Sequence, residues 1–483
     1  MDFLTSSENI SHEYCCSIVR TGRIVPIDGT DFLGKTLVNG FQVVVRRETV
    51  HEGDVLVYCP IETALNTDFL AANNAFGIEN RLLNANFSEV QRLIDRGQMQ
   101  EAKRKVGFFG KNGRIKIVRL RGEISMGCLF PFEYFANWLG KDKTAGFDPE
   151  AHIGLDFDTV AGIPFAKAYV PPYGNRRIER ANKRNKKLKK WSRLIPGEFT
   201  FHYDTEMLNR EIKRIKPTDR VAISVKLHGA SICIGNVKVK KPKQFRWSLL
   251  TRLYRLLPER WQKYDIDYDL VYSSRTIVKN ADLNPRLNAG FYEADIWRDF
   301  HDLLLGKIEP GVEIFGEIVG YITGTTQLLQ PGYDYGCAEG TNKMMPYRVA
   351  IKLPNGIRRE LNMDEVRLWT LDLVSKYPEL AEHIMPLEIL YCGTLRQLYP
   401  DIDVTNRWHA DILAAMMADH KRLGMEENEP LCHHQVPREG IILRIQDDIK
   451  NEAFKLKTVR FLEMEAAKID QGEVDLELQQ GNY

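Results

Sequence analysis

Short apolar runs with strand spacing dominate the hydrophobic pattern in the second half of this chain. The run at 221–225 is apolar at almost every position, which predicts a strand buried on both faces. Similar runs predict further strands, and apolar residues at helical spacing predict the helices between them. The predicted strands are 221–227, 231–236, 268–273, 312–319, 347–351, 439–445 and 453–457, and the predicted helices are 205–215, 292–305, 363–376, 378–383 and 408–423.

The first part of the chain has a different pattern, with short strands that follow one another closely. The predicted strands are 16–20, 23–26, 35–38, 41–46, 54–58 and 114–121, and one helix is predicted at 87–105. Closely spaced strands with a single helix are typical of a small closed barrel such as the OB-fold. Arg119 and Arg121 make the last strand basic, and OB barrels use such strands to follow a nucleic-acid backbone. Packing into a core explains the strands equally well.

Composition and charge narrow the class of protein. Hydrophobic residues make up 43% of the 483 residues and charged residues 27%, which is typical of a globular protein with sizeable cores. The formal net charge is only +2, but basic residues are clustered from Arg176 to Arg193 and from Lys238 to Lys263. Each cluster fits a phosphate-rich partner such as nucleic acid, and each taken alone fits a solvated surface equally well.

Targeting and cysteine patterns favour a soluble protein of a reducing compartment. The eight cysteines form no Cys-x-x-Cys pair, so neither a disulfide framework nor a zinc finger is indicated. The N-terminus lacks the basic start and apolar core of a signal peptide, and no apolar run reaches the roughly 18 residues that cross a bilayer. We expect a cytoplasmic monomer without membrane contact.

Lys226 ends the buried run at 221–225 and is the strongest candidate for chemistry. A lysine amine has an unperturbed pKa of about 10.4 and is a poor nucleophile while it is protonated. Burial, a neighbouring cation or a metal ion each disfavours the protonated form. Lys455 and Lys457 are two positions apart on one predicted strand, so both side chains face the same side. Two ammonium groups there favour an anion between them, such as a triphosphate, and a solvated face is the alternative.

Four further side chains complete the candidate site. Glu439 and Glu317 stand next to glycines in otherwise apolar runs, where an unpaired charge is costly. A divalent ion with its waters or a ribose hydroxyl would satisfy these carboxylates, and a structural salt bridge would do so equally well. Arg275 suits bidentate phosphate recognition. Tyr347 suits stacking on a purine, although aromatic residues on strands more often belong to a core.

The segments that carry these residues resemble motifs I, Ia, III, IIIa, IV and V of the covalent nucleotidyltransferases, the superfamily of ligases and mRNA capping enzymes. The matching segments are KLHGAS at 226–231, SSR at 273–275, FGEI at 315–318, YRVAI at 347–351, EGII at 439–442 and KLK at 455–457. A closer resemblance is to ATP-dependent RNA ligases with an N-terminal OB domain, of the Deinococcus and Naegleria type. RLRGEISMG at 119–127 and FTFHYD at 199–204 support it, and the likeness spans nearly the whole chain.

The resemblance implies an α+β fold with three parts. An OB-like β-barrel domain is expected at 1–170 and a basic linker at 171–195. A nucleotidyltransferase domain of the ATP-grasp-like ligase adenylation type, with antiparallel sheets flanked by helices, is expected at 196–483. About 25 residues follow the last motif, so we expect no second OB domain there, which disfavours a capping enzyme or an ordinary DNA ligase.

The resemblance also implies a reaction with ATP and Mg²⁺ or Mn²⁺ as cofactors. Lys226 would form a lysyl-AMP, pass the AMP to an RNA 5′-phosphate, and let a 3′-OH displace it, most readily at nicks in duplex RNA during RNA repair. Lys455 and Lys457 would act on the phosphates as further catalytic residues, and Glu439 would hold the metal. Nucleotide-binding residues would be Val225, Leu227, Arg275, Glu317 and Tyr347, and nucleic-acid-binding residues would be Arg119, Arg121 and Ser231.

Three features depart from the family pattern or stay unassigned. His228 stands where many relatives carry Asp or Asn, and Ser231 stands where several RNA ligases carry Asn. The long basic stretch at 237–268 has no assigned role, and contact with nucleic acid is the one that its charge suggests.

The alternatives to an RNA ligase, for the function of the protein, are a DNA ligase or mRNA guanylyltransferase of the same superfamily, or a catalytically silent RNA-binding protein.

Overall fold

The structure is a computed structural model, and it describes residues 3–7, 13–171, 193–202, 205–242, 264–281, 288–289, 292, 294–353, 355–405, 407–446 and 452–472. The chain divides into two compact units. Unit 1 comprises Met1–Pro171 and Leu462–Gln471, and unit 2 comprises Pro172–Phe461 and Gly472–Tyr483. Most of the predicted linker at 171–195 lies outside the described residues, and the boundaries predicted from the sequence stay predictions.

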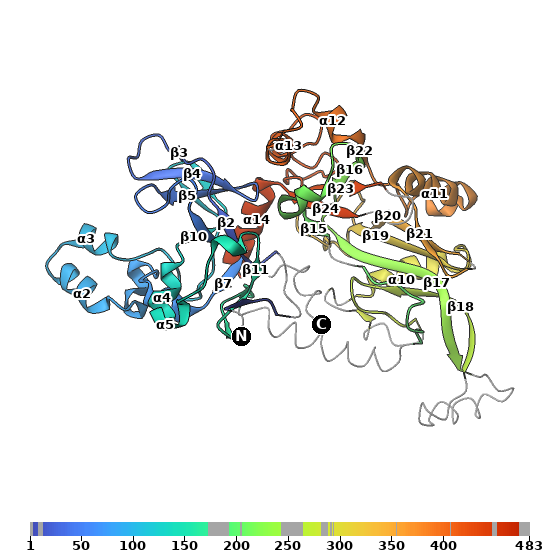
Figure 1. Cartoon of the computed structure of the whole chain (residues 1–483). Coiled ribbons are helices and arrows are strands. Elements are labelled where there is room, and N and C mark those ends of the chain that lie inside the picture. The colour runs from blue at the N-terminus through green and yellow to red at the C-terminus, as the bar shows by residue number, and fades with distance from the viewer. Residues whose placement is uncertain are drawn as a thin grey trace. The chain divides into compact units, whose positions relative to one another are not determined.

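Unit 1 is built from short strands and short helices (Figure 1). It has a four-stranded sheet of order β10-β6-β2-β11 and two three-stranded sheets of orders β3-β4-β5 and β1-β12-β13, and all three are antiparallel. The strands are β1 (Leu4–Thr5), β2 (Cys16–Arg20), β3 (Val25–Pro26), β4 (Leu33–Val38), β5 (Phe41–Arg46), β6 (Val55–Cys59), β7 (Thr63–Leu65), β8 (Val118–Leu120), β9 (Glu123–Ser125), β10 (Cys128–Phe130), β11 (Asp156–Phe157), β12 (Thr159–Val160), β13 (Ile163–Pro164) and β14 (Ala166–Ala168). Among the described residues these pairings do not close into a barrel, so the OB-like barrel stays a prediction.

The helices of unit 1 are short. They are α1 (Thr67–Ala72), η1 (Ile78–Leu83), α2 (Phe87–Asp95), α3 (Met99–Arg104), α4 (Glu133–Leu139), α5 (Lys141–Thr144) and η2 (Glu150–His152). The single helix predicted at 87–105 is wrong, because Gly97 adopts φ +75° after α2 and its amide bonds back to the carbonyl of Ile94. The strand predicted at 114–121 is limited to β8, because residues 113–115 hydrogen-bond instead to the backbone at 62–65.

Unit 2 contains two five-stranded sheets, and antiparallel pairing dominates both (Figure 1). The first, which we call the β16 sheet, has the order β15 (Glu206–Met207), β24 (Ala453–Lys457), β23 (Gly440–Ile445), β16 (Arg220–Lys226) and β22 (Ile389–Thr394). The second, the β17 sheet, has the order β18 (Tyr264–Ser273), β17 (Ala230–Pro242), β19 (Val312–Gly320), β20 (Asn342–Lys352) and β21 (Arg358–Glu360). Only β15 and β24 pair in parallel among these strands. The predicted mixed architecture of antiparallel sheets and helices is confirmed.

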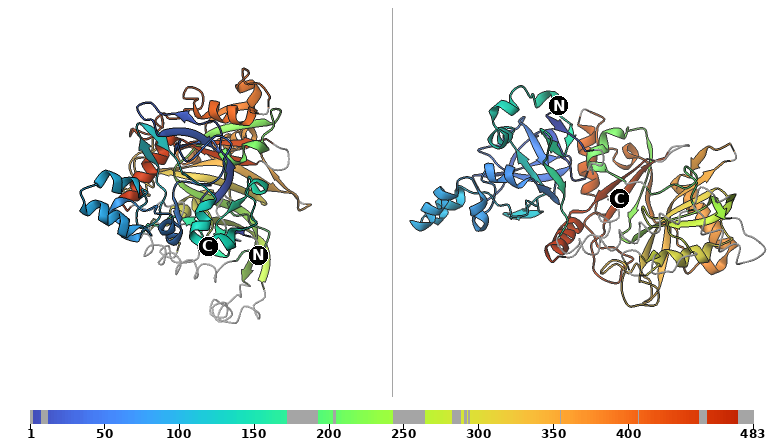
Figure 2. Two further views of the ribbon diagram at one scale, coloured as in Figure 1. Left: turned by 60° about the vertical axis from the view of Figure 1, so that its left-hand side comes forward. Right: turned by 90° about the horizontal axis from the view of Figure 1, so that it is seen from below.

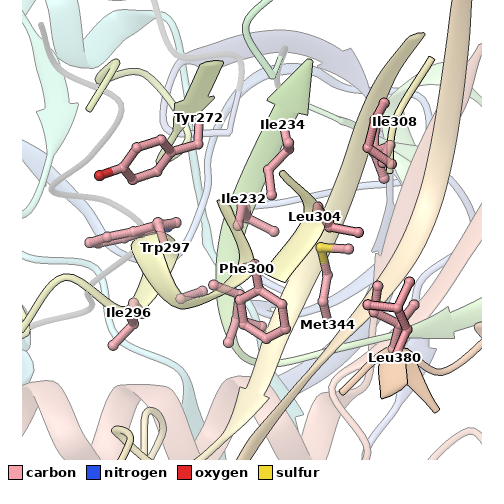
Figure 3. Close-up of a cluster of buried hydrophobic side chains, with 14 of the residues drawn as sticks. Ile232, Ile234, Tyr272, Ile296, Trp297, Phe300, Leu304, Ile308, Met344 and Leu380 are labelled. Carbon is pink, nitrogen blue, oxygen red and sulfur yellow. The ribbon is translucent and has the colours of Figure 1, made fainter. Parts of the chain in front are cut away.

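Helices cover one face of each sheet in unit 2. They are α7 (Leu208–Glu211), η3 (Ile212–Arg214), α10 (Ile296–Leu304), α11 (Met363–Lys376), η6 (Pro378–Leu380), α12 (Leu395–Leu398) and α13 (Trp408–Met417). On the β17 sheet, Ile232 and Ile234 pack with Trp297 and Phe300 of α10, as Figure 3 shows. On the β16 sheet, alternate strand residues pack with Trp408, Ile412 and Met416 of α13. These strand residues are Val221, Ile223, Ile441, Leu443, Phe454 and Leu456. Because strand side chains alternate, the other face of each sheet is directed away from these helices, and on the β17 sheet it carries a second apolar cluster that includes Cys233, Val271 and Phe315.

Most predicted elements of unit 2 are confirmed, and the differences have local causes. The helix predicted at 363–376 is α11, whose start is fixed by a capping box between Asn362 and Glu365. The helix predicted at 205–215 is wrong over its first residues, because Glu206–Met207 pairs with β24 as β15. α14 (Val459–Asp470), which belongs to unit 1 from Leu462 on, was not predicted. In the part of the chain that the structure describes, every helix is too short or too polar to span a bilayer.

Candidate active site

A pocket of about 750 Å³, measured with its open mouth, lies within unit 2 and is lined by both of its sheets. The two sheets can be followed from two further directions in Figure 2. The lining residues are His202, Thr205, Ser224, Val225, Lys226, Leu227, Ser231, Arg275, Glu317, Tyr347, Arg348, Leu387, Ile442, Arg444, Ala453 and Lys455. Five of them are Lys or Arg and one is Glu, so the pocket attracts an anion with several negative charges.

The register of the β16 sheet brings the predicted lysines together. Lys226 of β16 lies opposite Gly440 of β23, and Gly440 lies opposite Lys457 of β24. In the same way, Ile442 separates Ser224 from Lys455, which is buried. Gly440 has φ +154°, and a Cβ there would lie 2.1 Å from the carbonyl oxygen of Leu456. Only glycine lets the strands approach this closely, and the Glu-Gly pair at 439–440 has this steric cause.

An ion pair holds Lys226 at the back of the pocket. Its Nζ lies 2.6 Å from Oε1 of Glu439, whose side chain is fully buried, while the Lys226 side chain is 11% exposed. Lys457 Nζ lies 3.7 Å from the same oxygen, and Nδ1 of His228 lies 3.5 Å from Oε2. Burial alone would raise the pKa of Glu439. The charge of Lys226, followed by the hydrogen bond and charge of His228 and the charge of Lys457, outweighs burial and holds that pKa below its ordinary value.

The turn after Lys226 is fixed by its surroundings. The backbone N–H of His228 donates to the hydroxyl of Tyr335 at 2.8 Å, and the His228 ring packs edge-on against Tyr333 and Phe461. A Cβ at Gly229 would lie 2.2 Å from the carbonyl oxygen of Ile318, so this position also requires glycine. His228 therefore contributes its backbone N–H to the fixed turn and places its ring beside the Glu439 carboxylate.

The β17 sheet supplies the opposite wall. Ser231 pairs in register with Glu317, and both side chains line the pocket. The Tyr347 hydroxyl lies 3.1 Å from Nδ1 of His202 and 3.5 Å from Oγ of Ser231. Burial and then the charge of Glu317 raise the pKa of Tyr347, which keeps its hydroxyl protonated. The wall thus presents a neutral phenol, a hydroxyl and a carboxylate to a ligand.

Eight of the twelve predicted site residues line this pocket, two lie next to it, and two belong to the other unit. Lys226, Lys455, Val225, Leu227, Arg275, Glu317, Tyr347 and Ser231 line it. Glu439 lies directly behind Lys226, and Lys457 lies beside Glu439 with its Nζ 5.1 Å from the ring centre of Phe461. Arg119 and Arg121 belong to unit 1. There the Arg119 guanidinium forms two hydrogen bonds with the carboxylate of Glu463, at 2.7 and 2.9 Å.

Two buried arginines of the pocket were not predicted. Arg348 follows Tyr347 on β20 and lies 3.5 Å from the carboxylate of Glu360. Arg444 lies two positions after Ile442 on β23 and is 3% exposed. For Arg444, the available signal was a charged residue in the largely apolar run at 439–445, at the spacing that places it on the same face as Ile442.

Comparison with known proteins gives a structural likeness only. No protein-family model matches the sequence, and no curated protein does. Structures of an RNA ligase of Naegleria gruberi match over nearly the whole chain. A lysine-to-alanine variant with ATP and Mn has a TM-score of 0.51 at 16% identity, covering 93% of this chain and 98% of that one.

Two more structures of the same ligase agree. A second lysine-to-alanine variant with ATP and Mn has a TM-score of 0.50 at 16% identity, covering 94% of this chain and 99% of that one. A lysine-to-methionine variant with AMP and Mn has a TM-score of 0.51 at 15% identity, covering 93% and 98%. At this identity the likeness establishes architecture and no more. The chain therefore shares its fold with the RNA ligase of Naegleria gruberi.

Proposed function

We propose that this protein is an ATP-dependent RNA ligase that joins an RNA 5′-phosphate to a 3′-OH. The observation that carries the proposal is Lys226, which ends a buried strand in a cationic pocket and is paired with the buried Glu439. The shared fold with an RNA ligase supports it, as do the structures of that ligase with ATP and Mn.

In the first step, Lys226 Nζ forms a bond to the α-phosphorus of ATP while the bond to pyrophosphate breaks. The amine must first lose a proton, because an ammonium group has no lone pair for attack. Glu439 is a poor acceptor for that proton, since its pKa is lowered. Its charge instead favours the ammonium form, so a cation bound to Glu439 would weaken that preference, and the Lys226 ammonium would release its proton to solvent water.

The donor set suits a divalent ion shared with the nucleotide. The described residues contain no group of three or more His, Cys, Asp and Glu side chains that could hold an ion alone. Mg²⁺ commonly binds through one or two carboxylates together with phosphates and waters, and Mn²⁺ accepts similar oxygen ligands. Glu439 would hold the ion. The ion would neutralise charge on the phosphates and weaken the Lys226–Glu439 pair.

The other lining residues divide into two groups. Lys455, Lys457, Arg275, Arg348 and Arg444 would bind the phosphates and stabilise the charge that develops on the leaving pyrophosphate. Tyr347 would stack on adenine, Glu317 would accept from the ribose hydroxyls, and Val225 and Leu227 would flank the nucleotide.

In the second step, an oxygen of the RNA 5′-phosphate displaces Lys226 from the AMP phosphorus. In the third step, a 3′-OH attacks the activated 5′-phosphorus, loses its proton and releases AMP. Ser231 would contact the RNA end, and Arg119 and Arg121 of the OB-like domain at 1–170 would contact its backbone. We further propose nicked duplex RNA as the substrate, RNA repair as the role, and a monomer in the cytoplasm.

A sealing assay tests the proposal. The protein is incubated with ATP and Mn²⁺ or Mg²⁺ and a duplex whose nick carries a 5′-phosphate and a 3′-OH, made with RNA or with DNA strands. We expect sealing of the RNA nick with ATP and not with GTP. A DNA-only product would identify a DNA ligase, transfer from GTP would identify a guanylyltransferase, and RNA binding without any joining would identify a silent binding protein.

A further inference from the structure

Two neighbouring strands of unit 2, β17 and β18, extend past the rest of their sheet. β17 pairs with β19 only from Ala230 to Gly235, whereas its pairing with β18 continues to Pro242. Beyond Asn236 the two strands form a ribbon, which extends away from the sheet in Figure 1 and in the left view of Figure 2. This ribbon lies in the basic stretch at 237–268, for which the charge of the sequence suggested only an unspecified contact with nucleic acid.

The two faces of the ribbon have opposite character. On one face, Val237 and Val239 are buried, and two of the three aspartates form ion pairs: Asp269 lies 3.2 Å from Arg193, and Asp267 lies 3.0 Å from Lys241. The other face, which we call the Lys–Tyr face, consists of Lys238, Lys240, Tyr264, Ile266 and Tyr268. The register places Lys238 opposite Tyr268 and Lys240 opposite Ile266.

The Lys–Tyr face is exposed and positively charged. Ile266 is 66% exposed and Tyr268 is 39% exposed, although both are apolar or aromatic. The Nζ atoms of Lys238 and Lys240 lie 5.8 and 5.9 Å from the ring centres of Tyr268 and Tyr264. Among the described residues, neither lysine has a carboxylate within ion-pair distance. All carboxylates of the ribbon strands lie on the opposite face.

Cations that alternate with exposed aromatic rings match the chemistry of single-stranded nucleic acid. Lysines neutralise phosphates, and the rings offer surfaces on which bases stack in any sequence. A protein partner with acidic groups would use the lysines but not the paired rings. A second copy of the same face is disfavoured, because its lysines would repel those of the first.

We propose that the Lys–Tyr face binds a single-stranded segment of RNA. The proposal rests on the proposed ligase function for the identity of the nucleic acid. Ser231, in the pocket, and Lys238 are seven positions apart on β17, or about 23 Å at 3.3 Å per residue, and they project from opposite faces. The face therefore holds RNA away from the reacting ends and takes no part in the chemistry.

Binding of a fluorescein-labelled single-stranded RNA, followed by anisotropy over a range of salt concentrations, tests the proposal. Replacing Lys238 and Lys240 together by Ala should weaken binding about tenfold at 0.15 M salt, and should reduce the salt slope by about 1.4, or 0.7 per lost phosphate contact. Tyr268→Ala should weaken binding about fivefold or more without changing the slope. All variants should retain the circular dichroism spectrum of the parent.

Lys241→Ala is the matched control, because Lys241 neighbours Lys240 in sequence but projects from the opposite face. It should bind RNA like the parent, while Lys240→Ala alone should not. Equal weakening by Lys240→Ala and Lys241→Ala would reduce the effect to net charge and overturn the proposal. Parent-like binding by the double variant would overturn it too, as would a loss of self-association in Tyr268→Ala with RNA binding unchanged.

A parallel measurement separates this proposal from the proposed function. Each variant is incubated with α-labelled ATP and Mn²⁺, and covalent AMP is quantified. We expect parent-like labelling in all of them, because the Lys–Tyr face lies outside the pocket. If the parent itself is not labelled, the ligase function fails, while the anisotropy data still judge the RNA-binding face.

Discussion

Replacing Glu439 by Gln tests how strongly burial strengthens the ion pair of Lys226. The chain contains a matched pair with the same geometry. Lys226 Nζ lies 2.6 Å from Glu439, and Lys35 Nζ lies 2.6 Å from Glu123. The Lys226 and Glu439 side chains are 11% and 0% exposed, and those of Lys35 and Glu123 are 30% and 32% exposed. The pairs differ in burial and in their further partners, which are Lys457 and His228 at Glu439 and Gln42 at Glu123.

The magnitudes follow from the dielectric surroundings. At 2.6 Å the Coulomb attraction is about 6 kcal/mol for an effective dielectric constant of 20, and about 1.6 kcal/mol in bulk water. Removing one partner of a buried pair typically costs about 3–5 kcal/mol, since the remaining charge is stranded. Removing one partner of an exposed pair costs below about 1 kcal/mol. We therefore expect Glu439→Gln to destabilise its unit far more than Glu123→Gln.

Hydrogen exchange, read by mass spectrometry on peptides of each unit, measures both effects without assuming that the two units unfold together. Amides of β16 and β23 should exchange about 100-fold faster or more in Glu439→Gln, since 3 kcal/mol corresponds to about that factor. Amides of β8 and β9 should change less than about fivefold in Glu123→Gln. Equal acceleration in the two variants would refute the argument that burial strengthens the Lys226–Glu439 pair.

Three further outcomes are expected. Gly229→Ala should abolish AMP labelling and lower the thermal midpoint of unfolding, because its Cβ would clash with the backbone at 2.2 Å. Gly22→Ala is the control, since no atom lies closer than 3.9 Å to a Cβ there. Equal effects of the two substitutions would contradict the steric reasoning. Tyr347→Phe should raise the KM for ATP by no more than about tenfold, which corresponds to the loss of one neutral hydrogen bond. Tyr347→Leu should raise the KM further, because it also removes the ring. Similar KM values for the two variants would exclude stacking. Because the folded state lowers the pKa of Glu439, the stability that this carboxylate contributes is present above its ordinary pKa of 4.5 and is lost as the pH falls through the lowered value. Urea unfolding followed by tryptophan fluorescence should therefore show a steeper loss of stability with acid in the parent than in Glu439→Gln. Parallel curves would contradict this expectation.

Strands with local signals were predictable, and so was the lysine that ends one of them. β16 and β24 coincide with their predicted ranges to within a residue, because continuous apolar runs and period-two spacing need no distant information. The same spacing placed Lys455 and Lys457 on one face. Register between strands supplies what local pattern does not: that Gly440 lies between Lys226 and Lys457 depends on pairing across more than 200 positions of sequence.

The missed features depend on such long-range pairing. Arg348 and Arg444 are buried where they line the pocket between the two sheets, and Arg348 is paired with Glu360 of the neighbouring strand β21; local pattern gives neither the burial nor the partner. The extension of β17 to Pro242 is an exception, because its alternating Val and Lys at 237–240 is a local strand signal; what that pattern does not give is the partner strand β18. Sequence alone also left open whether Glu439 formed a salt bridge or a metal site. The structure shows the salt bridge, with Lys226 at 2.6 Å, and this partner is compatible with a metal ion bound at Glu439.

The most direct test of the account is the chemical state of Lys226 after exposure to ATP. The protein is incubated with ATP and Mn²⁺, digested, and its peptides are examined by mass spectrometry for covalently attached AMP. We predict one adduct, on the Nζ of Lys226, which is absent from Lys226→Ala while that variant keeps the parent's circular dichroism spectrum. An adduct on Lys455, Lys457 or any other residue, or none from folded parent protein with either metal, would contradict the assignment of Lys226 as the nucleophile.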